Sequence, residues 1–103
     1  MRRVRRSQSY VNALQSLLEQ GLTTLGYRVV DEKRQRVDAF IVDFLVKYPR
    51  TGSYDHELGL FVFPVSATPF VLIYDFDDAE LRLHLILHKK ADRTRIDTSK
   101  VDW

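Results

Sequence analysis

Hydrophobic residues recur with a helical period through the first half of the chain. Over residues 10–25 they fall at i, i+3, i+4 and i+7, which predicts an amphipathic helix. Ser9 is placed to cap its start, and Gly26 follows its last apolar residue. The helix therefore presents one apolar stripe to a core.

A second helical stripe runs over residues 30–48. Asp31 can cap this helix, and Pro49 closes it because the residue before a proline avoids the helical region. Only residues 26–29 separate the two stripes, so the helices are expected to form an antiparallel hairpin.

In the second half of the chain the period changes from helical to extended. Residues 50–57 predict a polar loop, and residues 58–65, 70–76 and 80–87 predict three strands joined by turns. Short connections of this kind favour an antiparallel meander. Before the helices, residues 2–6 place one valine between paired arginines, which allows a short edge strand.

The last strand alternates between two faces, because successive side chains of a strand point to opposite sides. One face carries Leu81, Leu83, Leu85 and Leu87, and the other carries Arg82, His84, Ile86 and His88. The leucine face is expected to lie on the helices. The strand over residues 60–63 is apolar on both faces, so something besides the helices must cover the sheet.

This order of elements predicts an α+β fold. An N-terminal helical hairpin, with the short edge strand before it left open, packs on an antiparallel sheet with a three-strand meander. The length of 103 residues predicts a single domain over residues 1–103. A hydrophobic content of 45% is typical of a globular chain, and a formal net charge of +2 does not by itself indicate a nucleic-acid partner.

Some classes of protein are excluded by composition. The absence of cysteine excludes disulfide scaffolds, thiolate nucleophiles and zinc sites with cysteine ligands. The longest uncharged apolar run, residues 58–65, is far below the ~20 residues of a membrane span. Residues 1–18 hold four arginines, three serines and no acid, as an organelle transit peptide would. The helical stripe over residues 10–25 favours the other interpretation, a basic strand leading into a core helix.

Four stretches, in this order, resemble the RelE/ParE superfamily of type II toxins. They are residues 47–52 (KYPRTG), residues 58–60 with 63–65 (LGL and FPV), residues 70–78 (FVLIYDFDD) and residues 85–92 (LILHKKAD). The resemblance covers most of the chain and implies a RelE/ParE-like fold. It also implies a cytoplasmic bacterial toxin that is neutralised by a cognate antitoxin encoded beside it, with no cofactor, no small-molecule substrate and no membrane partner.

The superfamily includes two mechanisms on one fold, and the fold does not choose between them. ParE-type members bind DNA gyrase and leave cleaved DNA complexes, with no catalysis assigned to the toxin. RelE-type members are ribosome-dependent endoribonucleases that cut messenger RNA in the A site. The uncharged strand over residues 60–63 and the absence of tyrosine from residues 89–103 depart from the RelE pattern. We therefore expect a ParE-like toxin, with the nuclease as the alternative.

A nuclease of this kind needs a base, an acid and cations that stabilise the phosphorane charge. The candidates are Arg82, His84 and His88, which share the polar face of the last strand. His84 and His88 are about 13 Å apart in a regular strand, so they do not reach one phosphate or one metal ion together. The other interpretation is that both histidines are ordinary sheet residues.

The sequence also predicts two surfaces that would contact other molecules. The first is a basic cluster that would touch the target or phosphate, or else form a solvated face: Lys89, Lys90, Arg93 and Arg95. The second would bind the antitoxin, with core packing and a charged sheet edge as the alternatives: Arg3, Arg5, Phe61, Phe63 and Trp103. A plain nucleic-acid-binding module is a third hypothesis, which the low net charge disfavours.

Overall fold

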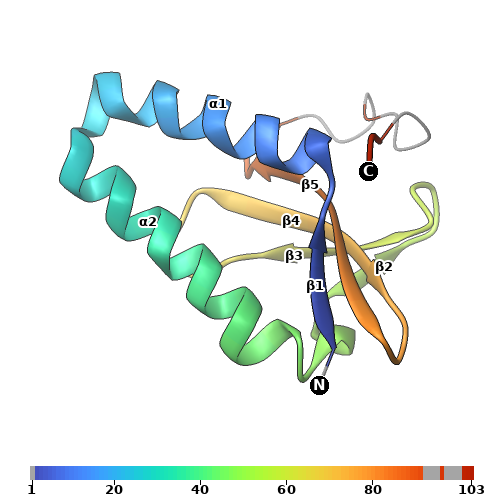
Figure 1. Ribbon diagram of the computed structural model, residues 1–103. Helices are drawn as coiled ribbons and strands as arrows, with labels where there is room; N and C mark the ends of the chain where they lie inside the picture. Colours follow the sequence, from blue (N-terminus) through green and yellow to red (C-terminus); the bar gives the residue numbers. More distant parts are fainter. Residues whose placement is uncertain (1, 92–95, 97–100) are drawn as a thin grey trace.

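The fold is a helical hairpin packed on a five-stranded sheet (Figure 1). A computed structural model describes residues 2–91, 96 and 101–103. The elements in chain order are β1 (Arg3–Arg6), α1 (Gln8–Leu25), α2 (Tyr27–Phe40), the π-helical η1 (Ile41–Leu45), the 3-10 turn η2 (Pro49–Thr51), β2 (Ser53–Asp55), β3 (Leu60–Pro64), β4 (Phe70–Phe76) and β5 (Glu80–His88). Among the described residues, no helix combines the length and apolar character that crossing a membrane requires.

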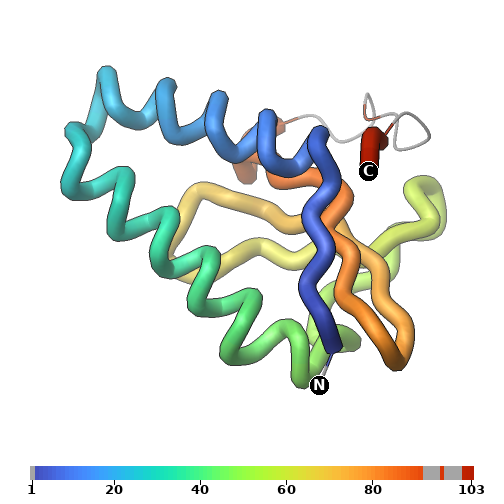
Figure 2. Tube along the Cα trace, in the orientation of Figure 1, coloured from blue at the N-terminus to red at the C-terminus, as the bar shows by residue number. Residues whose placement is uncertain are grey.

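The sheet has the strand order β1-β5-β4-β3-β2. Strands β3, β4 and β5 form the expected three-strand antiparallel meander, and β2 extends it by a fourth strand. Strand β1 pairs with β5 in the parallel direction. The prediction of a wholly antiparallel sheet is therefore wrong at this edge. A parallel pair needs a long crossover, and the helical hairpin begins that crossover (Figure 2).

Both helices begin earlier than their apolar stripes. The N-cap of α1 is Ser7 rather than Ser9, because the buried Ser7 Oγ accepts from the Tyr10 amide at 2.8 Å and donates to the His84 carbonyl at 2.6 Å. Gly26, with φ of 86°, is the only residue between α1 and α2. Asp31 therefore lies inside α2, where it pairs with Arg34 at 2.9 Å instead of capping the helix.

The polar segment over residues 50–57 contains a strand that sequence periodicity missed. Strand β2 pairs with β3, with Ser53 opposite Val62 and Asp55 opposite Leu60. It has three residues and forms the outer edge of the sheet, so it shows no apolar alternation to detect. Its pairing depends on the partner strand and not on its own composition.

Apolar residues cover both faces of the sheet, as the doubly apolar β3 predicted. The helix-side core joins the helical hairpin to inward residues of β4 and β5, among them Tyr10, Val37, Ile41, Leu45, Leu72, Tyr74, Leu81, Leu83 and Ile86. The outer face holds a second, smaller cluster of Leu60, Val62, Val71 and Ile73, with Leu85, Leu87 and Ile96 packed on it. Ile96, which follows β5 in the chain, thus contributes to covering the outer face.

A β-bulge in β5 corrects the predicted leucine face. Ile73 lies opposite Leu85 but Tyr74 lies opposite Leu83, so His84 is an extra residue between the two pairs. An extra residue inverts the alternation of everything beyond it. Leu81 and Leu83 therefore join the helix-side core, as expected, whereas Leu85 and Leu87 lie on the outer face.

Candidate functional site

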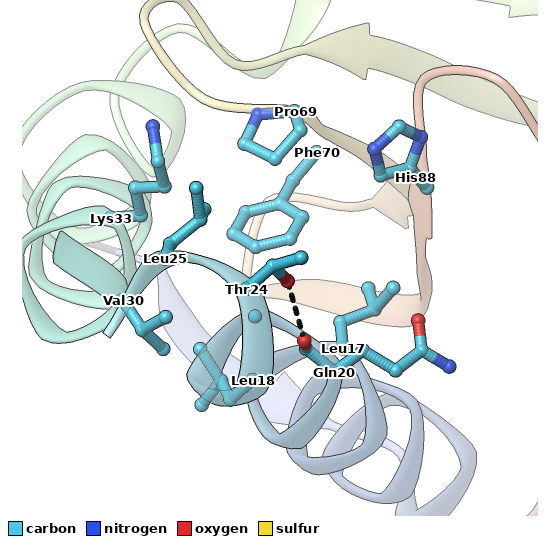
Figure 3. A pocket seen from close by; sticks show the side chains of 11 residues that line it. Leu17, Leu18, Gln20, Thr24, Leu25, Val30, Lys33, Pro69, Phe70 and His88 are labelled. Carbon is cyan, nitrogen blue, oxygen red and sulfur yellow. Dashed lines mark hydrogen bonds between the residues drawn. The ribbon is translucent and has the colours of Figure 1, made fainter. Parts of the chain in front are cut away.

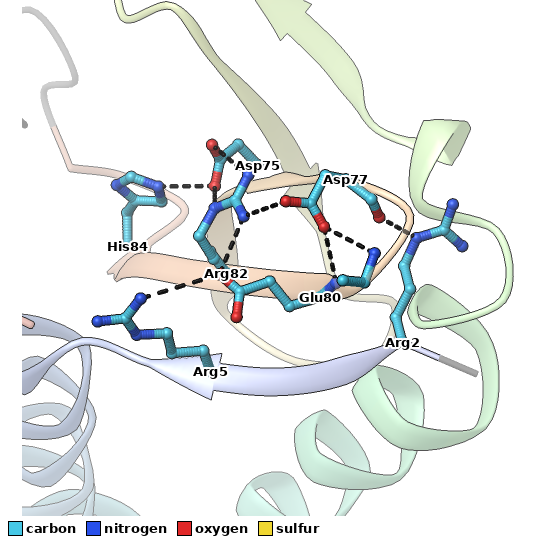
Figure 4. A network of polar contacts seen from close by, with 8 residues as sticks. Arg2, Arg5, Asp75, Asp77, Glu80, Arg82 and His84 are labelled. Atoms are coloured by element: carbon cyan, nitrogen blue, oxygen red, sulfur yellow. Dashed lines mark hydrogen bonds and ion pairs between the residues drawn. The ribbon is translucent and has the colours of Figure 1, made fainter.

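Arg82 lies at the centre of a carboxylate cluster on the outer face of the sheet (Figure 4). Its Nε and Nη2 donate to the two carboxylate oxygens of Asp75, at 2.8 and 3.1 Å. Its Nη1 donates to Asp77 at 2.8 Å and to Glu80 at 3.0 Å. These bonds occupy four of the five N–H donors of a guanidinium. They also raise the pKa of Arg82, because each one favours the charged form.

Two carboxylates of this cluster, those of Asp75 and Asp77, have a pKa below the usual range of an aspartate. Hydrogen bonds from Arg82, then from the backbone N–H groups of Glu80 and Ala79, lower the pKa of Asp77 to about 2. Burial alone would raise the pKa of Asp75, but hydrogen bonds from Arg82 and His84 outweigh it and the pKa is lowered. Three carboxyl groups therefore surround one arginine, which disfavours the approach of a phosphate.

His84 is enclosed beside this cluster. Its Nε2 lies 2.9 Å from Asp75 Oδ1, and the centroid of its ring lies 4.7 Å from that of Trp103 in an edge-on arrangement. Its side chain is only 15% exposed. Among the described residues, its Nδ1 is buried without a hydrogen-bond partner. A large RNA substrate therefore has little access to this imidazole.

The C-terminal residues hold this enclosure in place. The Gln8 amide donates to the Asp102 carbonyl at 2.6 Å, and the Asp102 amide donates to Ser9 Oγ at 3.3 Å. Arg5 lies over the Trp103 ring, 5.0 Å from its centroid. Residues 102 and 103 thus dock at the junction of β1 and α1.

His88 does not share a face with Arg82 and His84, which corrects the sequence-based assignment. The bulge at His84 turns His88 to the helix side, where it lies opposite Phe70. There it lines an apolar cavity of about 210 Å³ beneath the tip of the helical hairpin, together with Leu17, Gln20 and Pro69 (Figure 3). Two of the three candidate nuclease residues are thus on one side of the sheet and the third is on the other.

The basic cluster begins directly after β5. Lys89 and Lys90 are exposed, and their backbone amides donate to the Pro69 carbonyl at 2.7 Å and to His88 Nδ1 at 3.1 Å. These bonds fix the turn and leave both ammonium groups in solvent. Arg93 and Arg95, the other predicted members, lie outside the described residues.

The predicted antitoxin contacts separate into two groups. Arg3 and Arg5 are exposed on the edge strand β1, and Trp103, 43% exposed, lies against Arg5. Phe61 and Phe63 are half-buried in the helix-side core instead. The ring centroid of Phe61 lies 5.6 Å from that of Tyr74, and the centroid of Phe63 lies 4.8 Å from that of Phe40. Their placement favours the core interpretation.

Tyr74 of β4 is fully buried, and its hydroxyl holds a loop. Its hydroxyl donates to the Pro49 carbonyl at 2.6 Å and accepts from the Gly52 amide at 3.1 Å. Burial raises the pKa of Tyr74 to about 12, and the Gly52 amide acts in the opposite direction. The phenol therefore stays protonated and serves the loop structure.

A basic concavity beside this loop was missed from the sequence. It is lined by Arg2, Lys47, Tyr48, Pro49, Arg50 and Thr51 and has a volume of about 430 Å³. Residues 47–50 (KYPR) place a tyrosine and a proline between two cations, which is a signal that hydrophobic periodicity does not reveal. The contribution of Arg2 depends on the fold alone. No group of three or more His, Cys, Asp or Glu residues is arranged to hold a metal ion in the described part of the chain.

Comparison with known proteins supports the fold assignment. No family model matches the chain, and no curated protein matches it. A similar solved structure is a chain of the "Chromosomal ParDE TA system from P. aeruginosa", with a TM-score of 0.72 and 14% sequence identity. The match covers 85% of this chain and 96% of that one. The present chain therefore has the fold of that ParDE-system chain, which confirms at the level of the fold the α+β, RelE/ParE-like architecture that the sequence motifs predicted.

Proposed function

We propose that this chain is the toxin of a type II toxin–antitoxin pair and arrests bacterial growth by binding DNA gyrase in the cytoplasm. The observation that carries the proposal is the fold shared with a chain of a ParDE system over nearly the whole of both chains. One fold serves both mechanisms of the superfamily. The choice between gyrase binding and RNA cleavage therefore rests on the positions of the side chains.

The arrangement of the candidate nuclease residues favours binding over RNA cleavage. Arg82 is committed to three carboxylates, and His84 is enclosed by Asp75 and Trp103. His88 lies on the opposite side of the sheet. Cleavage needs an acid, a base and a phosphate clamp within reach of one scissile bond, and these side chains do not converge in that way.

Two surfaces remain as the proposed contacts. Lys89 and Lys90, which are exposed at the end of β5, would contact the target. Arg93 and Arg95, which follow them in the sequence, would belong to the same contact. The exposed edge of β1, with Arg3, Arg5 and the adjacent Trp103, would contact the antitoxin. An extended antitoxin arm could add to this edge strand through its backbone, with acidic residues placed against the arginines.

Controlled expression in a bacterial host tests the toxin assignment first. Growth should stop on induction and resume when the product of the adjacent antitoxin gene is co-expressed. The purified protein, incubated with gyrase and supercoiled plasmid, should then accumulate cleaved DNA. Unimpaired growth at full expression would refute the toxin assignment.

A primer-extension assay with ribosomes and a defined messenger tests the alternative. We expect no new 5′ ends from a preparation that still arrests growth. Discrete cuts inside codons at the A site, seen only when ribosomes are present, would overturn the gyrase proposal and make the protein a RelE-like nuclease.

A further inference from the structure

The basic concavity lies where three distant segments of the chain meet. Arg2 comes from the start of the chain, Lys47 and Tyr48 from the turn that follows η1, and Arg50 from η2. Figures 1 and 2 show the start of β1 beside the end of the helical segment formed by α2 and η1, and near the β4–β5 turn. A hydrogen bond from Arg2 Nη1 to the Val46 carbonyl, at 3.1 Å, fixes this juxtaposition.

Neutral partners hold the two arginines of the concavity. The guanidinium carbons of Arg2 and Arg50 lie 5.5 and 5.6 Å from the centroid of the Phe76 ring. Arg2 also donates from Nε to the Asp77 carbonyl at 2.6 Å. A ring and main-chain carbonyls position a cation without cancelling its charge. Within the described residues, neither arginine nor Lys47 takes part in an ion pair. Three uncancelled cations therefore face one hollow.

The concavity is also lined by the aromatic ring of Tyr48, which packs against other rings. Tyr48 is 58% exposed, and its ring centroid lies 5.2 Å from that of Phe44. Phe44 in turn stacks on Phe40 at 5.4 Å, and Phe40 stacks on Phe63 of β3 at 4.8 Å. This column of rings runs from the sheet to the surface. It holds the Tyr48 ring in position while leaving more than half of the side chain open to a ligand.

We propose that this concavity binds a nucleotide unit, with the phosphate among Arg2, Lys47 and Arg50 and the base against Tyr48. An acidic peptide would use the cations alone, whereas a nucleotide uses the cations and the exposed ring. A base is available for such stacking in a single strand or a free nucleotide but not in an intact duplex. The inference goes beyond the proposed function and does not depend on gyrase as the target.

Fluorescence anisotropy with a labelled oligothymidylate tests the cations. Three phosphate contacts predict that log K falls with log salt concentration with a slope of about −2, at about 0.7 per contact. The double variant Lys47→Gln/Arg50→Gln should reduce the slope to about −0.7 and weaken binding at low salt. The matched control Arg28→Gln/Arg36→Gln changes the net charge equally at two exposed positions of α2 and should bind like the unaltered chain.

A second pair of variants tests the ring. Tyr48→Ala should weaken oligothymidylate binding by about fivefold or more without changing the salt slope, because stacking releases no counterions. Tyr27→Ala, which removes another exposed tyrosine from the far end of α2, is the control and should leave binding unchanged. Thermal melts of all four variants would establish that each is folded as well as the unaltered chain.

The outcomes separate the possible ligands. Displacement of the labelled strand by excess ATP would support the nucleotide site and identify free nucleotides as a source, whereas displacement only by a second strand would identify single-stranded nucleic acid. Equal binding by the Lys47→Gln/Arg50→Gln variant and its charge-matched control would overturn the proposal. Unchanged binding by Tyr48→Ala would overturn it as well, and so would binding of polyglutamate in place of the oligonucleotide.

Discussion

The Tyr74 hydroxyl connects the core to the loop that carries Arg50, and its removal should cost measurable stability. Tyr74→Phe deletes two hydrogen bonds and leaves the buried Pro49 carbonyl and the half-buried Gly52 amide without partners. A protein hydrogen bond contributes about 1 kcal/mol net, and an unsatisfied buried group costs about 1–3 kcal/mol. Because water can reach the Gly52 amide, we expect a total loss of about 2 kcal/mol.

Urea and thermal denaturation measure this loss directly. For a domain of about 100 residues, 2 kcal/mol corresponds to a decrease in Tm of about 10 °C. The control is Tyr54→Phe, because Tyr54 is 48% exposed and its hydroxyl has no hydrogen-bond partner among the described residues. If Tyr74→Phe lowers Tm no further than Tyr54→Phe does, the hydroxyl does not hold the loop and the reasoning fails.

A double-mutant cycle with Gly52 tests the same contact from the other side. A Cβ at Gly52 would overlap the Tyr74 hydroxyl, while its next contact, the Val62 carbonyl at 3.0 Å, is tight but less severe. Gly52→Ala should therefore cost less stability in the Tyr74→Phe background than in the unaltered chain. Contacting residues commonly couple by about 0.5–3 kcal/mol. Strictly additive losses would contradict the proposed packing.

Three further predictions concern charge and function. Changing Lys89, Lys90 and Arg93 together to alanine should weaken growth arrest in an induction assay through lost target contacts, and full toxicity would exclude the cluster from target binding. His88→Ala alone should retain growth arrest in the same assay, since only a catalytic His88 would make the variant inactive. The pKa of Asp77 falls from 3.8 to about 2 on folding, so its contribution to stability is present above about pH 4 and is lost as pH falls through about 2. Asp77→Asn should therefore flatten the acid side of a stability–pH curve measured by urea denaturation.

Local periodicity determined the framework of this protein. Two helical stripes separated by a short connection specify the hairpin, because each helix has one face that must be buried. The extended apolar segments near residues 60–64, 70–76 and 80–88, separated by turn residues, specify the meander. The RelE/ParE-like motifs lie along these elements, so the fold class could be predicted from the sequence alone.

Pairing between distant segments decided the candidate sites. The parallel pairing of β1, the edge strand β2 and the bulge at His84 depend on partner strands, which local sequence does not reveal. Because of the bulge, His88 lies on the opposite face of the sheet from Arg82 and His84. The pairing of β4 with β5 places three carboxylates, at and beside the turn between them, around Arg82. Arg2 reached Arg50 only because the chain start packs beside the end of the second helix. Local sequence therefore determined the two helices and the three meander strands. Tertiary packing determined the edge pairings and which side chains meet, because long-range contacts carry no local periodic signal.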